Sequence, residues 1–388
     1  MIYLDNAATS FPKPSCMLRE MERCIRDYCG NPGRSGHELS VRTGEKIYEA
    51  RNEIASLFGV QDPSRIIFTS NTTEGINMGL KGVLNPGDHV ITTSMEHNSV
   101  LRPLKALEWH GIQTCIIKCD ECGRLNPTEV EHAITPSTRL IICTHVSNVT
   151  GTKIPIAQIG KIANKRGILF MVDAAQSAGT IDINVEKLGI DLLAAPGHKG
   201  LLGPQGTGIL YIKEGIPFRH FKEGGTGTDS KNRKQPVEFP EGYESGTLNS
   251  PGIIGLGASV KWIKRIGIKE IHEHEMELLA QLYEDLSNMR NIEIYGPKDM
   301  NERSGIITIN IEHMDCEEAA ASIWENFRIA VRGGYHCAGL AHRTIGTWNT
   351  GAIRISVGPF NTRNEIRRAI DAIYKLAKKS YHKDIKEY

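Results

Sequence analysis

Ala194-Ala195-Pro196-Gly197-His198-Lys199-Gly200 is the stretch on which the interpretation of this chain depends. It closes an apolar run and leads into the glycine-rich residues 203–208. Upstream, Met171-Val172-Asp173-Ala174-Ala175-Gln176 is a second strand-like run, and it leads to an acid. A single lysine after glycine is usually a solvated surface residue, so the meaning of Lys199 depends on the rest of the chain.

An acid and a lysine at the ends of neighbouring buried strands suit pyridoxal phosphate. Lys199 would form a Schiff base with the aldehyde of this cofactor. Asp173 would keep the pyridine nitrogen protonated, so that the ring can accept electrons. The pair therefore indicates a pyridoxal-phosphate site.

Length, charge and cysteine content narrow the class of protein. The chain has 388 residues, which is too many for one hydrophobic core, and two domains are expected. A net charge of +1 gives no reason to expect nucleic acid or a membrane surface as a partner. Nine irregularly spaced cysteines indicate no disulfide framework and favour the cytoplasm. We expect neither a signal peptide at the N-terminus nor an apolar run of the ~20 residues that span a bilayer.

Cys119 and Cys122 form a C-x-x-C pair, which can bind zinc or carry redox chemistry. No second pair lies at a suitable distance along the chain. A turn is the favoured interpretation, and no metal site is expected.

Short apolar, β-branched runs alternate with helical stretches between residues 66 and 212. This alternation predicts an α/β fold with a mostly parallel sheet covered by helices. Helices are expected near 74–84, 100–110 and 156–166. The expected strands cover residues 66–69, 89–92, 115–117, 140–143, 168–172, 192–195 and 208–212.

The remainder of the chain has a different character. Residues 221–245 are rich in glycine and charge, which predicts a long exposed loop or hairpin. Residues 251–289 have helical periodicity, and the segment after them is predicted to be α+β. Its expected elements are strands at 306–311 and 352–357 and helices at 316–326 and 363–378.

Two segments are candidates for holding the cofactor. Residues 69–74, Thr-Ser-Asn-Thr-Thr-Glu, join a strand to a helix, and a helix N-terminus can bind a phosphate through its N–H groups. Plain N-capping by Asn71, Thr72 or Thr73 is the alternative, and the two roles are compatible. His97 follows another strand and could stack on a ring, although a single histidine is more often structural.

A cysteine and an arginine near the C-terminus are further candidates. Cys337 follows His336 in the glycine-rich run Arg332-Gly333-Gly334-Tyr335-His336, and positive neighbours favour a reactive thiolate. A small buried cysteine is the alternative. Arg354 is a charge within an apolar strand, so it needs a protein acid or a substrate carboxylate as its partner.

Taken in this order, the motifs resemble the class V aminotransferase family of fold-type I pyridoxal-phosphate enzymes. Within it the chain resembles the cysteine desulfurases, nearest to the group II branch that includes selenocysteine lyase-like proteins. The resemblance extends from Leu4 to Thr362. It implies a large domain at 15–259 with a mostly parallel seven-stranded sheet, and a smaller α+β domain formed by 1–14 and 260–388.

The resemblance also implies roles at the cofactor. Lys199 is the Schiff-base lysine and the base that moves the Cα proton of the substrate. Asp173 pairs with the pyridine nitrogen, and His97 stacks on the ring and takes part in catalysis. The remaining contacts are Gln176 and Asn148 at the ring hydroxyl, and Thr72, Thr73 and His198 at the phosphate.

For the substrate and the assembly, the resemblance implies that Arg354 binds the carboxylate, with Asn148 close to it. Cys337 attacks the substrate sulfur, and His37 lies at the edge of the site. Thr247 reaches the phosphate of the neighbouring subunit, so a homodimer with shared sites is expected.

The implied reaction converts L-cysteine to L-alanine and leaves a persulfide on Cys337, from which an acceptor protein takes sulfur for cofactor biosynthesis. The alternatives are selenocysteine lyase, cysteine-sulfinate desulfinase, an epimerase, an aminotransferase, or a catalytically silent scaffold. Two positions depart from the family pattern. Pro196 replaces a serine or threonine, which removes a phosphate contact, and Tyr335 replaces the first histidine before the cysteine.

Overall fold

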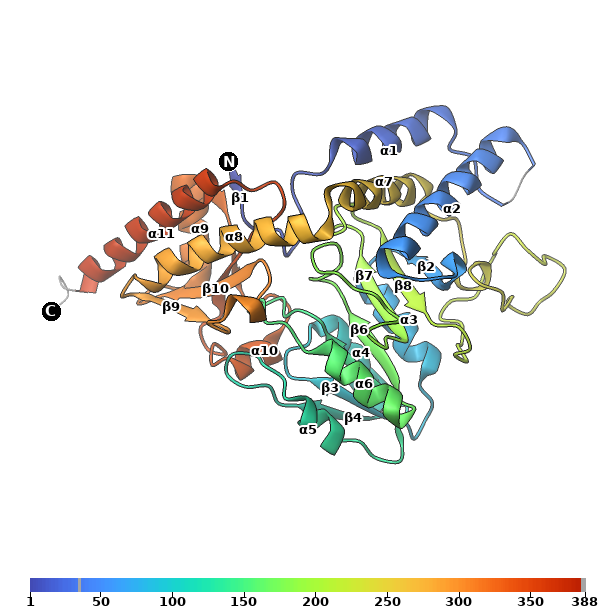
Figure 1. Cartoon of the computed structure of the whole chain (residues 1–388), viewed down its shortest axis with the longest axis horizontal. Coiled ribbons are helices and arrows are strands. Elements are labelled where there is room, and N and C mark those ends of the chain that lie inside the picture. Colours follow the sequence, from blue (N-terminus) through green and yellow to red (C-terminus); the bar gives the residue numbers. More distant parts are fainter. Residues whose placement is uncertain (34–35, 385–388) are drawn as a thin grey trace.

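A seven-stranded sheet forms the centre of the computed structural model, which describes residues 1–33 and 36–384 (Figure 1). Its strand order is β2-β8-β7-β6-β5-β3-β4, and β8 alone runs antiparallel to its neighbours. The prediction of a mostly parallel sheet is confirmed. The strands are β2 (Ile66–Thr69), β3 (His89–Thr93), β4 (Gln113–Ile117), β5 (Thr138–Thr144), β6 (Leu169–Asp173), β7 (Leu192–Pro196) and β8 (Gly208–Ile212).

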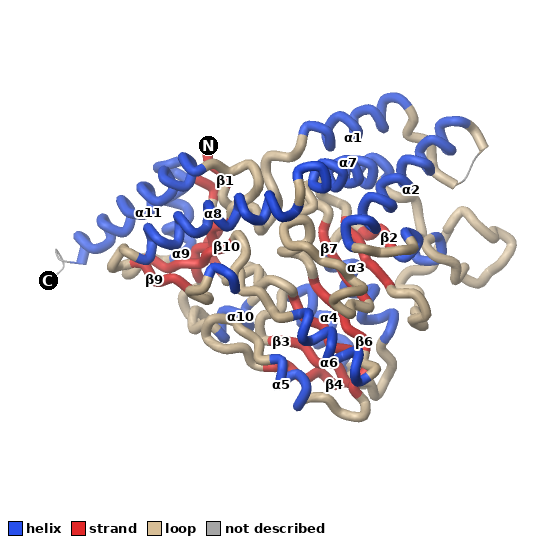
Figure 2. Tube along the Cα trace, viewed as in Figure 1, coloured by secondary structure: helices blue, strands red, loops and turns tan. Residues whose placement is uncertain are grey.

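Helices cover both faces of this sheet, and each face has its own apolar core (Figure 2). One core joins the sheet to α3 (Thr72–Val83) and α4 (Asn98–Glu108). The other includes α6 (Ile156–Arg166) and α2 (Glu38–Phe58). Because both faces are buried, the strands consist of nearly continuous apolar residues rather than alternating ones. The short α5 (Pro127–His132) packs beside α6.

A second, antiparallel sheet has the order β12-β13-β10-β9. It consists of β9 (Ile292–Tyr295), β10 (Ile306–Ile311), β12 (Arg332–Gly334) and β13 (Ala352–Ser356). The helices α8 (Ile268–Ser287), α9 (Cys316–Phe327) and α11 (Arg363–Asp384) pack on it, and α10 (Gly339–Thr344) follows β12 in the chain.

The N-terminus belongs to this second body. Strand β1 (Ile2–Tyr3) pairs with β11 (Ile329–Ala330), and Ile2 and Leu4 lie in its core. The C-terminal part is α+β and takes up the N-terminal segment, as the sequence indicates. The exact boundaries at residues 14 and 259 stay a prediction; the second falls inside α7 (Ser250–Ile266).

Two features differ from the expectation, whereas the long loop predicted for 221–245 is present. The helix expected over 251–289 is two helices, α7 and α8, because Gly267 lies between them at φ 104°. The helices α1 (Ser15–Asp27) and α2 were not predicted, and both pack against α7 (Figure 1). The segment 221–245 is a long irregular loop with one 3-10 turn, Glu241–Tyr243. No helix of the described part is both long and apolar enough to cross a bilayer.

Candidate active site

A pocket of about 190 Å³ opens where β6 and β7 end. It is lined by residues from five separate segments of the chain, which only the fold brings together. Eight of the nine predicted cofactor residues are among them: Thr72, Thr73, His97, Asn148, Asp173, Gln176, His198 and Lys199. Pro196, the position that departs from the family pattern, also lines this pocket.

Lys199 and Asp173 are the two charged groups at the centre of the pocket. Burial lowers the pKa of Lys199 to about 8, with nearby Arg354 as the next cause. About a tenth of the amine is therefore neutral at pH 7 and able to act as a nucleophile or a base, against fewer than about one in a thousand for an ordinary lysine. Burial raises the pKa of Asp173, whose carboxylate accepts a hydrogen bond from the Ala175 N–H at 2.9 Å. A cation placed against Asp173 would restore its charged form.

The start of α3 forms the anion-binding end of the pocket. Asn71 caps the helix, with its side-chain oxygen 2.9 Å from the Glu74 N–H. The hydroxyls of Thr72 and Thr73 are therefore not needed for this cap. The Thr72 hydroxyl is buried and has no hydrogen-bond partner among the described residues. An unsatisfied hydroxyl beside the first N–H groups of a helix fits a bound phosphate.

Two neutral histidines flank the lysine. Burial lowers the pKa of His97 to about 4 and that of His198 to about 4, and in both cases the positive charge of Lys199 adds to the effect. The His97 Nδ1 accepts from the Ser99 N–H at 3.0 Å, which caps α4 and fixes the ring at the pocket wall. The structural role and the proposed ring-stacking role are therefore compatible.

The N-terminal segment packs against residues of this pocket, although the sequence indicated no role for its side chains. The Ser10 hydroxyl lies 2.9 Å from the Lys199 carbonyl oxygen, and Lys13 Nζ lies 2.7 Å from that of His198. The Gln176 side chain donates to the Ala7 carbonyl at 3.0 Å. The only signal in the sequence was that the resemblance begins at Leu4, before the first helix.

Asn148 connects this pocket to the cysteine turn. Its side-chain amide donates to the His336 carbonyl at 2.8 Å, and the Asn98 N–H donates to the Cys337 carbonyl at 2.9 Å. Cys337 itself is exposed. Two hydrogen bonds thus attach the turn that carries the accessible thiol to the wall of the Lys199 pocket, although the two segments lie far apart in the sequence.

Arg354 is almost completely buried and has a protein partner. Its Nη2 lies 2.9 Å from Asp5 Oδ1, and its Nη1 donates to the Asn148 carbonyl at 2.9 Å. Its Nε is buried without a partner among the described residues. Of the two partners that the sequence left open, the structure contains the protein acid.

Arg332 is a second arginine at this edge, and the sequence analysis treated it only as a neighbour of the cysteine. It is paired with Arg354 across β12 and β13, so both side chains lie on one face of the sheet. None of the described acids lies within ion-pair distance of Arg332. Its positive charge contributes to the lowered pKa values of Lys199 and His97.

Thr247 and His37 lie away from the pocket of their own chain. Thr247 is exposed and follows Gly246, which has a φ of 100°. The exposed His37 caps α2, with its Nδ1 accepting from the Ser40 N–H at 3.2 Å. Their roles at a partner's site and at the substrate stay predictions.

Two other features lie outside this pocket. Cys119 is buried at a turn near Cys122, and no group of metal-binding side chains occurs in residues 1–33 and 36–384.

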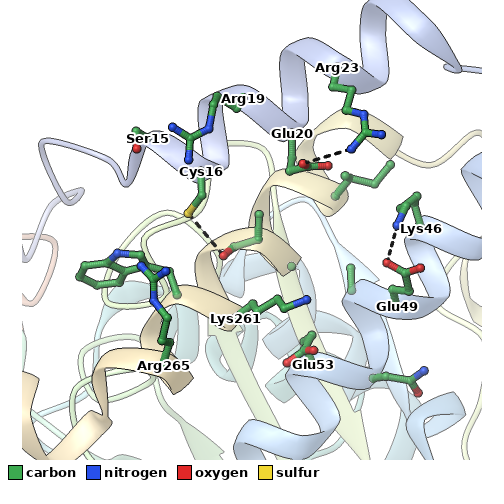
Figure 3. A pocket seen from close by; sticks show the side chains of 16 residues that line it. Ser15, Cys16, Arg19, Glu20, Arg23, Lys46, Glu49, Glu53, Lys261 and Arg265 are labelled. Atoms are coloured by element: carbon green, nitrogen blue, oxygen red, sulfur yellow. Dashed lines mark hydrogen bonds and ion pairs between the residues drawn. The ribbon is translucent and has the colours of Figure 1, made fainter.

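A larger groove, of about 780 Å³, lies among α1, α2 and α7 (Figure 3). Two of its acids, Glu20 and Glu49, pair with Arg23 and Lys46 within the groove. It shares no lining residue with the Lys199 pocket.

Comparison with known proteins agrees with this geometry. The family described as Aminotransferase class-V matches residues 2–369. This chain belongs to the class V aminotransferase family. The match covers the central sheet, the second sheet and all of the pocket residues named above.

Relatives of this class V aminotransferase have consistent names. A probable cysteine desulfurase of Methanothermobacter thermautotrophicus is 37% identical, over 97% of this chain and 94% of the relative. A cysteine desulfurase of Cronobacter sakazakii is 31% identical, over 97% and 93%. The apo structure of a cysteine desulfurase from Thermococcus onnurineus superposes with a TM-score of 0.92, at 34% identity over 97% of this chain and 94% of that one.

Proposed function

We propose that this chain is a pyridoxal-phosphate-dependent cysteine desulfurase. The observation that carries the proposal is the position of an exposed cysteine, Cys337, whose turn is hydrogen-bonded to residues at the wall of the Lys199 pocket. The names of relatives that cover almost the whole chain support the same activity.

The pocket residues fit pyridoxal phosphate. The unsatisfied Thr72 hydroxyl and the start of α3 would hold its phosphate, and the Asp173 carboxylate would hold its ring nitrogen. Neutral His97 would cover one ring face, while Gln176 and Asn148 would lie at the ring hydroxyl. When bound through Lys199, the cofactor would withdraw electrons from the Cα of an amino-acid substrate.

Arg354 and Arg332 would orient the substrate. The free Nε of Arg354 would donate to the substrate carboxylate, and Arg332 would add a second positive charge on the same sheet face. Arg354 keeps its position because Asp5 and the Asn148 carbonyl hold its other nitrogens. A preorganised arginine loses little entropy when a carboxylate binds.

The chemical step uses two side chains of this chain. The Lys199 amine takes the Cα proton, and its pKa of about 8 suits a base at neutral pH. The Cys337 thiolate attacks the substrate sulfur. An S–S bond forms, the substrate Cβ–S bond breaks, and the bonding electrons pass to Cβ, which takes up a proton. Lys199 returns the proton to Cα. The products are L-alanine and a persulfide on Cys337, and the proton lost by the Cys337 thiol balances the one gained by Cβ.

The active assembly is a homodimer, in which Thr247 contacts the phosphate at its partner's site. Thr247 is exposed and absent from the pocket of its own chain, which supports this role. Exposed apolar side chains on α1 and α2, namely Leu18, Ile25, Leu39, Val41 and Tyr48, provide a surface that a second copy could cover.

The nine free cysteines support a reducing cytoplasm, where an acceptor protein would take the sulfur from exposed Cys337.

A product assay with L-cysteine, selenocysteine and cysteine sulfinate tests the function. L-Cysteine should give equal amounts of alanine and sulfide in the presence of a reductant. Cys337→Ala should lower this activity at least ~10²-fold, while Cys29→Ala, at another exposed cysteine, should not change it. If Cys337→Ala keeps the activity on L-cysteine, the desulfurase proposal is wrong. If only selenocysteine or cysteine sulfinate reacts, the protein is instead a selenocysteine lyase or a cysteine-sulfinate desulfinase.

A further inference from the structure

The turn that presents Cys337 has an unusual backbone conformation. His336 and Cys337 have φ values of 53° and 56°, so two successive non-glycine residues are left-handed. Such residues cost roughly 1–3 kcal/mol each, and they persist only where the surrounding structure holds them. The turn therefore needs a support, and the Lys199 pocket provides only part of it.

A chain of buried hydrogen bonds lies behind this turn. His336 Nε2 is 3.1 Å from the Arg332 carbonyl oxygen, and His336 Nδ1 is 3.2 Å from His342 Nε2. On the far side, His342 Nδ1 is 2.7 Å from the Thr347 hydroxyl. The three side chains that form these hydrogen bonds, His336, His342 and Thr347, are all buried.

The donors and acceptors of these hydrogen bonds follow one consistent order. Because a carbonyl oxygen can only accept, His336 Nε2 is the donor to Arg332, and in a neutral ring Nδ1 is then an acceptor. His342 Nε2 is therefore a donor, and its Nδ1 accepts the Thr347 hydroxyl. Both rings are neutral, because burial lowers the pKa of His336 to about 2, with Arg354 as the next cause, and that of His342 to about 4. The Arg332 carbonyl thus fixes the tautomers of both rings, and the Thr347 hydroxyl is the donor that satisfies the last acceptor, His342 Nδ1.

Tyr335 packs against the outer side of this hydrogen-bond chain. Its ring meets His342 edge-on, with 5.3 Å between centroids, and its hydroxyl donates to the Trp348 carbonyl at 2.8 Å. Tyr335 thus ties the residue before the turn to the loop that contains Thr347. This packing gives a physical reason for a tyrosine where the family pattern has a histidine.

We propose that Tyr335, His342 and Thr347 are positioning residues for Cys337, which they hold through His336 in the conformation needed to meet the substrate sulfur. The inference rests on the proposed function for its catalytic consequence. None of the three lines the Lys199 pocket, so they act on the thiol and not on the cofactor. The turn is held between this hydrogen-bond chain on one side and Asn148 and Asn98 on the other.

Thr347→Val is the deciding variant, since it keeps the side-chain shape and removes the hydroxyl. Without that donor, the buried His342 Nδ1 loses its partner, which weakens the hydrogen bonds that hold His336. We expect kcat for alanine formation to fall about ten- to a hundredfold, with the KM for cysteine and the absorbance of the bound cofactor unchanged. Thr347→Ser restores the hydroxyl and should restore the rate. Thr344→Val, whose hydroxyl donates to the Leu340 carbonyl, is the matched control.

Amide hydrogen exchange provides a readout that needs neither cofactor nor activity. The Asn98 N–H donates to the Cys337 carbonyl and the Ala338 N–H to that of Tyr335, so both report on the turn. Exchange at these amides should be at least ~10-fold faster in Thr347→Val and unchanged in Thr347→Ser and Thr344→Val. If Thr347→Val fails to fold, Tyr335→Phe, at a half-exposed site, should give a smaller increase of roughly two- to tenfold.

The outcomes separate the two proposals. Wild-type exchange in both Thr347→Val and Tyr335→Phe overturns the positioning role, whatever the activity of the enzyme. A wild-type kcat in Thr347→Val, or a failure of Thr347→Ser to recover it, does the same. A wild-type protein that makes no alanine from cysteine overturns the proposed function alone, because the exchange comparison still tests the support of the turn.

Discussion

Arg354 and Asp5 form an ion pair, with 2.9 Å between Nη2 and Oδ1, that joins strand β13 to the N-terminal segment. The arginine side chain is 1% exposed and that of the aspartate 20%. The positive charge proposed to bind the substrate is therefore already held by an acid about 350 residues away in the sequence. If Arg354 binds the substrate as proposed, the N-terminal segment belongs to the active site because it supplies this partner.

Asp5→Ala should destabilise the protein. Removing one member of a buried pair leaves the other charge uncompensated, which costs about 3 kcal/mol, at the low end of the usual range because Asp5 is partly exposed. The thermal midpoint should fall by roughly 3–4 °C for a chain of this length. Glu22→Ala, which breaks the exposed pair with Arg26, is the control and should leave the midpoint in place. An unchanged midpoint in Asp5→Ala would mean that Arg354 does not depend on this acid.

The rate of cofactor loading should report the lowered pKa of Lys199. Only the neutral amine attacks an aldehyde, so the rate rises with pH until Lys199 is deprotonated. With a pKa of about 8, loading of cofactor-free protein should increase about tenfold between pH 7 and pH 9. An ordinary lysine would give an increase of about a hundredfold over the same range. Stopped-flow absorbance after mixing with pyridoxal phosphate distinguishes the two, and a hundredfold rise would contradict the buried, low-pKa lysine.

Mixed dimers test whether Thr247 acts at the partner's site. Thr247→Asp should weaken phosphate binding by charge repulsion, and Lys199→Ala should abolish the site of its own chain. A dimer with one chain of each kind would then keep one intact site, made of wild-type Lys199 and the partner's Thr247. We expect about half the activity of the wild-type dimer from the purified hybrid, whereas each parent variant is nearly inactive. If Thr247 acts within its own chain, the hybrid will be no more active than its parents.

Pro196→Ser should strengthen cofactor binding. Pro196 lines the pocket at the end of β7 and has neither a hydroxyl nor a backbone N–H to offer a phosphate. One added hydrogen bond should lower the dissociation constant of pyridoxal phosphate up to about tenfold, as measured by equilibrium dialysis. Pro196→Ala, which adds no hydroxyl, is the control. Equal affinities in the two variants would show that the serine hydroxyl does not reach the cofactor.

The central sheet could be predicted because its strands are buried on both faces. Such strands are continuous apolar runs, and the glycine and acid residues that follow them are easily seen. Helix α1 was missed for the opposite reason. Of its thirteen residues only Met17 and Cys24 are buried, so its apolar stripe is too sparse to recognise. In α2, polar residues such as Thr43 and Arg51 occupy buried positions and disguise the pattern.

The site was predictable where a residue type has few chemical uses, and less so where its role depends on a distant partner. Lys199 and Asp173 stood out because they follow apolar runs. Ser10 and Lys13 did not, because their contacts are to the backbone of His198 and Lys199. Backbone carbonyls carry no sequence signal, so only the fold reveals which side chains bind them.

The sequence by itself determined the alternation of strands and helices in the central sheet, the lysine and acid at the sheet's edge, and the cysteine within a glycine-rich turn. These are local properties, because burial and chain flexibility are reflected in neighbouring residue types. Only the tertiary structure decided that Asp5 pairs with Arg354, that Asn148 joins the pocket to the turn of Cys337, and that Thr347 and two histidines form one chain of hydrogen bonds. Each of these depends on atoms that lie about 3 Å apart, and such distances are fixed by packing and not by the types of the neighbouring residues.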